Sequence, residues 1–160
     1  MQWGMQNGWN KRNFQGGTAM RQIDEIIIHC TATEGGTSVP IQRIESWHKA
    51  QGYDSIGYHY VIQPNGTIQT GRRISKAGAH CKGHNAHSIG IAYVGGMNDG
   101  KPQDTRTIAQ MESIQILISL LLMMYPDIKK ITGHNEYTNK ACPCFNVQQY
   151  RDMYACFLQS

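Results

Sequence analysis

Ile26-Ile27-Ile28-His29 is the stretch of the sequence that decides the fold. Three consecutive β-branched residues form a short apolar run, which is typical of a strand buried on both faces of a sheet. His29 then stands at the end of that strand. We expect the folded domain to begin close to this strand and to span residues 23–160. Residues 1–22, which are rich in Gly, Asn and Gln, are expected to form a flexible arm or leader.

Helical and strand patterns alternate along the rest of the chain. Pro40 and Gly52 bracket a helical pattern, because Pro suits the start of a helix and Gly its C-cap. Two strands over 58–62 and 67–70 are expected to form a hairpin, since Pro64-Asn65-Gly66 lies between them. Residues 78–88 are rich in Gly, Ala and His and predict a long loop before a strand over 89–94.

The strongest helical pattern begins at Thr107, which forms a capping box with Gln110, and ends before Pro126. A short strand over 130–132 follows, and a helix with apolar residues on one face is expected over 147–158. Strands that alternate with helices predict an α/β fold. We therefore expect a single domain in which a central mixed β-sheet is flanked by helices.

Composition excludes several classes of protein. The chain has 160 residues, 40% of them hydrophobic and only 16% charged, which is unlike a disordered chain. The net charge of +4 is not gathered into a basic stripe, so the sequence predicts no nucleic-acid binding. No apolar stretch approaches the roughly 20 residues that a spanning helix needs. Residues 1–20 contain no apolar signal-peptide core, which predicts synthesis in the cytoplasm without general secretory export.

Three possible zinc ligands stand where strands give way to loops, namely His29, His134 and Cys142. Catalytic zinc takes three such ligands and keeps a fourth position for water. A zinc site at the strand ends is therefore one interpretation, and buried structural side chains are the other. A closed structural site made from His134, Cys142, Cys144 and Cys30 is a further alternative.

A second spacing of histidines lies in the loop over 78–88, where His80, His84 and His87 follow one another. On a helix this spacing could bind a metal ion. Gly83 and the surrounding small residues predict a loop instead, which favours a role in lining a groove or in contact with solvent.

Four segments of the chain resemble the type-2 N-acetylmuramoyl-L-alanine amidases, a family that includes phage amidase-type lysozymes and peptidoglycan recognition proteins. The similarity runs from about Ile23 to Tyr150, in order and at family-like spacing. The segments are Ile26-Ile27-Ile28-His29-Cys30-Thr31-Ala32-Thr33, Gly57-Tyr58-His59-Tyr60, Gly90-Ile91-Ala92-Tyr93-Val94-Gly95-Gly96 and His134-Asn135-Glu136-Tyr137-Thr138-Asn139-Lys140-Ala141-Cys142-Pro143.

The resemblance implies a zinc enzyme that cuts the amide between the lactyl group of N-acetylmuramic acid and the first L-alanine of the stem peptide. It assigns one Zn²⁺ per chain to His29, His134 and Cys142, with Tyr58 and Lys140 as the other catalytic residues. A cation such as Lys140 near the metal can stabilise the oxyanion of a tetrahedral intermediate. A phenol at position 58 can orient the attacking water or accept its proton.

Glu136 is an alternative general base, because two positions along an extended segment return to the same side. The interpretation that we favour is that Glu136 holds its loop by hydrogen bonds. We assign Cys30, Cys144 and Cys156 to packing. The polar loop suggests contacts with glycan or stem peptide, and the candidate residues are His80, Lys82, His84 and Asn85.

Two other functions are compatible with the family. Some recognition proteins bind peptidoglycan without cleaving it, but the complete set of ligands and catalytic residues in this sequence favours an enzyme. Some phage relatives bind an RNA polymerase, and nothing in this sequence supports that partner. We expect a monomer that reaches the cell wall after lysis or by non-classical delivery.

Overall fold

The computed structural model describes residues 20–160. Its main sheet has five strands in the order β4-β3-β5-β1-β8. β1 pairs in parallel with β5 and β8, β3 pairs in parallel with β5, and only β4 runs antiparallel to its neighbour. The strands are β1 (Glu25–Cys30), β3 (Tyr60–Ile62), β4 (Ile68–Thr70), β5 (Ser88–Tyr93) and β8 (Lys130–Gly133). The prediction of a mixed central sheet in a single domain is confirmed.

β1 lies inside the sheet between β5 and β8, and all six of its residues are buried. Its side chains alternate between the two faces of the sheet. Ile26, Ile28 and Cys30 belong to the larger apolar core. Glu25 and His29 therefore share the opposite face, where both are almost completely buried polar groups.

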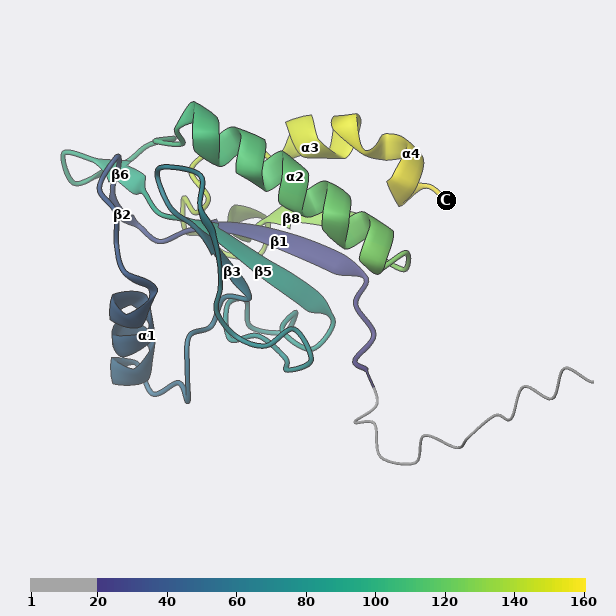
Figure 1. Cartoon of the computed structure of the whole chain (residues 1–160), viewed down its shortest axis with the longest axis horizontal. Coiled ribbons are helices and arrows are strands. Elements are labelled where there is room, and N and C mark those ends of the chain that lie inside the picture. The colour runs from purple at the N-terminus through teal and green to yellow at the C-terminus, as the bar shows by residue number, and fades with distance from the viewer. Residues whose placement is uncertain (1–19) are drawn as a thin grey trace, which may run out of the picture.

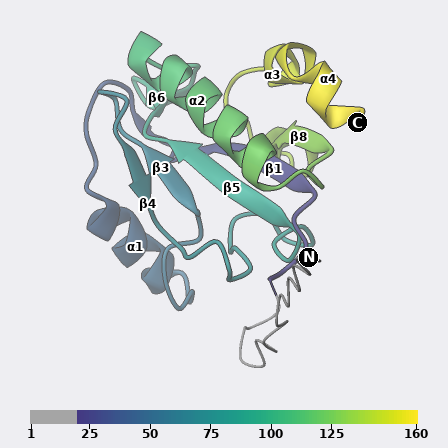
Figure 2. The same ribbon diagram turned by 45° about the vertical axis from the view of Figure 1, so that its right-hand side comes forward.

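Helices cover both sides of this sheet (Figures 1 and 2). α2 (Ile108–Met124), α3 (Gln148–Met153) and α4 (Ala155–Leu158) lie over one face, and Ile114, Ile118 and Tyr150 pack there in the larger core. α1 (Ile41–Ala50) lies beside β3 on the other side, where Ile44 packs in a smaller cluster. A second small sheet contains β2 (Thr33–Glu34), β6 (Gly96–Asn98) and β7 (Lys101–Pro102).

Several local predictions are confirmed. The capping box of α2 is formed, since the Thr107 hydroxyl accepts from the Gln110 amide and the Gln110 side chain accepts from Thr107. The hairpin joins β3 to β4 through a turn in which Gly66 has a φ of +87°. Gly52, which follows the C-cap residue Gln51 of α1, has a φ of +96°, the left-handed conformation that glycine favours just after a helix.

Two predicted elements are shorter than expected. The strand predicted over 58–62 begins only at Tyr60, because the Gly90 amide donates to the His59 ring instead of a strand carbonyl. The helix predicted over 147–158 is divided at Tyr154. The Tyr154 hydroxyl donates to the Gln115 carbonyl of α2, and this contact holds the break against the core.

The predicted arm over 1–22 lies almost entirely outside the described residues. Arg21, near its end, is attached to the domain: its guanidinium donates to the carbonyls of Ile74 and Ser88 at 2.7 and 2.8 Å. Within residues 20–160, no helix is both long and apolar enough to cross a membrane.

Candidate metal centre

Three possible ligands meet at one edge of the main sheet. His29 lies near the carboxyl end of β1, and His134 opens a short 3₁₀ turn (His134–Glu136) directly after β8. β1 and β8 are parallel neighbours, so their carboxyl ends reach the same edge. Cys142 lies on the loop that follows. One ligand atom from each of the three residues lies within 4.8 Å of the other two.

His80 fixes the orientation of the His29 ring. The His29 Nε2 and His80 Nδ1 atoms are 2.8 Å apart, and His80 Nε2 lies 3.2 Å from the Ser88 hydroxyl. If His29 Nε2–H donates to His80 Nδ1 and His80 Nε2–H donates to the Ser88 hydroxyl, the lone pair of His29 Nδ1 is left free. This atom lies 3.7 Å from the Cys142 sulfur. Such outer hydrogen bonds select the tautomer that a metal ligand needs.

The space for the His80 ring depends on Gly90. A Cβ atom at position 90 would lie 2.6 Å from the His80 Cγ and Cδ2 atoms, which is closer than carbon atoms approach in proteins. A side chain at this position of β5 would therefore displace the ring that orients His29.

The protonation states of the three residues suit a metal ion. Burial, with smaller contributions from His80 and His134, holds the pKa of His29 well below its usual range. Burial and the Lys140 ammonium lower the pKa of His134. Hydrogen bonding from Cys30 lowers the pKa of the Cys142 thiol despite its burial. Two neutral imidazoles and a thiol that ionises readily form a donor set of the kind that zinc prefers.

Cys30 and Cys144 lie beside this centre without completing it. The Cys30 side chain lies on the core face of β1, and its sulfur is 3.8 Å from that of Cys144. The Cys144 thiol donates to the Gly96 carbonyl at 3.3 Å, and the Cys30 amide donates to the Cys142 sulfur at 3.2 Å. The cluster therefore brings His29, His134 and Cys142 together. The closed alternative with Cys30 and Cys144 is not the arrangement found.

The Tyr58 ring lies next to the candidate ligands, with its centroid 5.2 Å from that of His29. Burial, followed by the nearby Cys142 and Cys30 thiols, raises the Tyr58 pKa. The phenol therefore stays protonated at neutral pH. In this state Tyr58 can orient a water molecule by hydrogen bonding more readily than it can accept a proton.

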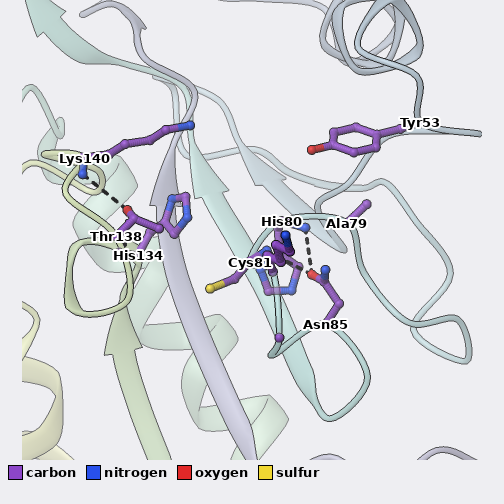
Figure 3. Close-up of a pocket in the computed structure, with 10 residues that line it drawn as sticks. Tyr53, Ala79, His80, Cys81, Asn85, His134, Thr138 and Lys140 are labelled. Atoms are coloured by element: carbon purple, nitrogen blue, oxygen red, sulfur yellow. Dashed lines mark hydrogen bonds between the residues drawn. The ribbon is translucent and has the colours of Figure 1, made fainter.

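A pocket of about 430 Å³ opens beside the centre (Figure 3). His134, Thr138 and Lys140 line one side of it, and Tyr53 and His80 lie across from them. Lys140 is exposed to solvent, and its charge is close enough to affect both His29 and His134. The pocket thus places a cation at the mouth of the candidate metal site.

The residues suggested as substrate contacts have different surroundings. Lys82 and Asn85 line the pocket, and the Asn85 side-chain oxygen also accepts from the amides of His80 and Cys81 at 2.9 Å. The His84 ring points elsewhere and lies 3.2 Å from the buried Glu25 carboxylate. Within the described residues, His84 does not line this pocket.

Glu136 is engaged in holding its loop. One of its carboxylate oxygens accepts from the Gly133 amide at 2.9 Å and from Arg151 at 2.9 Å. These contacts agree with the favoured interpretation of this residue.

Sequence reasoning did not identify two residues near the centre. Tyr53 lines the pocket from the turn after α1. The His48 ring accepts from the Gly57 amide at 2.8 Å and packs edge-on against Tyr58, with 5.0 Å between the ring centroids. The helical pattern around His48 does not reveal these contacts, because both partners lie outside α1, on a loop.

Comparison with known proteins identifies the family. The family model described as N-acetylmuramoyl-L-alanine amidase matches residues 19–145. The endolysin of Escherichia phage T7 is 40% identical over 128 residues, which cover 79% of this chain and 84% of the endolysin. The endolysin of Klebsiella phage KP32 is 34% identical over 134 residues, or 83% of this chain and 88% of that protein.

Solved structures share the fold. The N-acetylmuramoyl-L-alanine amidase LysC from Clostridium intestinale has a TM-score of 0.73 and 29% identity, and the match covers 84% of this chain and 87% of LysC. Bumblebee PGRP-SA has a TM-score of 0.68 and 25% identity, covering 81% of this chain and 80% of that chain. The resemblance drawn from the motifs is confirmed, and this chain belongs to the N-acetylmuramoyl-L-alanine amidase family.

Proposed function

We propose that the chain is a zinc-dependent peptidoglycan amidase, which hydrolyses the amide between the lactyl group of N-acetylmuramic acid and L-alanine of the stem peptide. The proposal rests mainly on one observation. His29, His134 and Cys142 converge beside the pocket that His134 lines. The family and the phage endolysin relatives support the same activity.

One Zn²⁺ would be held at this centre by His29, His134 and Cys142. When bound, zinc supplies an activated water nucleophile and a Lewis acid for the scissile carbonyl. The thiolate and two neutral imidazoles carry one negative charge between them, so a divalent ion keeps a net positive charge there. His80 acts as a positioning residue, because it touches His29.

Tyr58 and Lys140 would act on the reacting groups. The protonated Tyr58 phenol donates a hydrogen bond that orients the attacking water. The Lys140 ammonium is placed to stabilise negative charge that develops on the carbonyl oxygen during attack. The pocket wall that contains His80, Lys82 and Asn85 is the proposed contact for glycan or stem peptide.

The test is release of soluble stem peptides from purified peptidoglycan, identified by mass spectrometry. We expect peptides with a free L-alanine amino terminus, which disappear with a chelator and return with Zn²⁺. Cys142→Ser should abolish release, whereas Cys156→Ser, at an exposed thiol, should retain it. Binding to peptidoglycan without release would instead identify a recognition module.

We further propose that the protein is made in the cytoplasm and acts as a monomer on the cell wall, which it reaches after lysis or by non-classical delivery. The apparent mass in solution and the wall fragments released by added enzyme test the monomeric state and the action on the wall.

A further inference from the structure

A second group of ionisable side chains lies at the other end of β1. Glu25 begins this strand, and its carboxylate is completely buried. One carboxylate oxygen accepts from the hydroxyls of Thr132 and Tyr137, at 2.7 and 2.5 Å. Among the described residues, only His84 and His87 offer a positive partner to this carboxylate within salt-bridge distance.

Burial of a carboxylate is costly unless a cation compensates its charge. The other Glu25 oxygen lies 3.2 Å from His84 Nδ1 and 4.0 Å from His87 Nδ1. A divalent ion held between these imidazoles and the carboxylate would supply the compensating charge.

The geometry is close to that of a metal site. The three ligand atoms lie within 4.8 Å of one another. Zinc bonds of about 2.0–2.2 Å in a tetrahedron place ligand atoms about 3.3–3.6 Å apart. The Glu25–His84 pair, at 3.2 Å, is close to this separation. The Glu25–His87 pair must close by about 0.4–0.7 Å, and the His87 side chain, 39% exposed, has room to move.

The His84 ring is held in place for such a role. It stacks on the Tyr137 ring with 3.7 Å between the centroids and an angle of 27°. The same tyrosine donates to Glu25. Tyr137 therefore fixes both the carboxylate and one imidazole, and outer contacts of this kind support the ligands of a metal.

We propose that Glu25, His84 and His87 form a second divalent-metal site, of the carboxylate and imidazole type that accepts Zn²⁺. This site is distinct from the proposed catalytic centre and does not depend on the proposed function. It lies on the same face of β1, four residues before His29, or roughly 13 Å along the strand.

The second site would have no thiolate ligand. Cys81 is nearby, but burial and the Glu25 charge raise the pKa of its thiol. Residues 1–19 contain no His, Cys, Asp or Glu, so they add no ligand of these types. In the described structure His87 Nδ1 lies 2.7 Å from an Asp24 oxygen, and a metal ion would compete with that exposed contact.

An ion at this position would tie the pocket loop to the sheet. His84 and His87 lie on the same loop as His80 and Asn85, which line the pocket. The ion would link this loop to β1 and, through Tyr137, to the segment that contains Lys140. The role that follows is to hold the pocket walls in place.

The experiment is a metal titration of the chelator-stripped full chain, with bound metal measured after equilibrium dialysis. Zn²⁺ gives the number of sites, and Co²⁺ distinguishes them, because only the Cys142 centre gives thiolate-to-cobalt charge-transfer absorption. We expect two equivalents in the wild type, and one in His87→Ala with the charge-transfer band retained. Cys142→Ser should also bind one equivalent, without the band.

Control variants keep the test decisive. Lys82→Ala, at an exposed position in the same loop, should keep two equivalents. Glu25→Gln preserves side-chain shape and should bind one, and circular dichroism verifies folding of each variant. The proposal is overturned if the wild type binds one equivalent with the band, or if His87→Ala and Glu25→Gln still bind two. A wild type that binds one equivalent without the band would support this site and refute the zinc centre of the proposed function.

Discussion

Replacement of His80 by alanine tests how the metal centre is positioned. His80 Nδ1 lies 2.8 Å from His29 Nε2, and both rings are buried. Without His80, the His29 Nε2–H loses its acceptor and its ring loses the contact that fixes its angle. The substitution leaves all three proposed metal ligands in place. Its effect therefore measures orientation of a ligand rather than loss of one.

The size of the effect can be estimated from comparable sites. Loss of an outer hydrogen-bond partner of a metal-binding histidine typically reduces metal affinity or activity by about 10–100-fold. This range corresponds to about 1.4–2.7 kcal/mol. His80→Ala should therefore weaken zinc affinity by about 10–100-fold. Ser88→Ala removes only the hydrogen bond between the Ser88 hydroxyl and His80 Nε2, at 3.2 Å, and should reduce zinc affinity by less.

The assay is competition for Zn²⁺ with a chromophoric chelator, combined with kcat and KM on soluble peptidoglycan fragments. Because His80 also lines the pocket, a purely substrate-binding role would raise KM and leave zinc affinity unchanged. Lys82→Ala is the matched control on the same wall and should not alter zinc affinity. Unchanged zinc affinity in His80→Ala would refute the positioning role.

Three further predictions concern charge and protonation. Lys140→Ala should lower kcat by about 100-fold or more with zinc affinity retained, because it removes a cation from the developing oxyanion; an unaltered kcat would exclude this role. Glu136→Gln should keep activity within about tenfold, since glutamine can still accept from Gly133 and the lost pair with Arg151 is partly exposed; a loss of about 100-fold or more would make Glu136 the general base. Burial lowers the pKa of His59 to about 4 from 6.5, so the unfolded chain binds more protons than the native one between these values. Stability should therefore fall as the pH decreases from 6.5 to 4, by up to about 3 kcal/mol from this group. Denaturant titrations of the wild type and His59→Gln check this, and equal pH dependence in the two would contradict it.

The elements with a strong local pattern could be predicted from the sequence. The apolar run of β1 and the capped periodic helix α2 are examples, because their own residues determine both the period and the ends. The ends of weaker elements depended on distant contacts. Tyr154 interrupts the last helix through bonds to α2, and His59 shortens β3 by taking the Gly90 amide. Neither contact leaves a trace in the local sequence.

The candidate site divides in the same way. Residue type and family resemblance selected His29, His134 and Cys142, but only the parallel pairing of β1 with β8 explains why the two histidines meet. The bond from His29 to His80 joins residues 51 positions apart, across a loop without periodicity. For this reason sequence reasoning placed His80 among possible substrate contacts and could not identify its partner.

Side chains of the loop over 78–88 contact residues near both ends of β1, on one face of the sheet. His80 contacts His29 at one end, and His84 and His87 contact Glu25 at the other. Since one loop carries the partners of both ends, an ion held at Glu25 would limit the positions that His80 can adopt, and an ordered His80 would limit those of His84. Coupling between two binding sites is reciprocal in free energy. An ion bound at either end should therefore strengthen binding at the other.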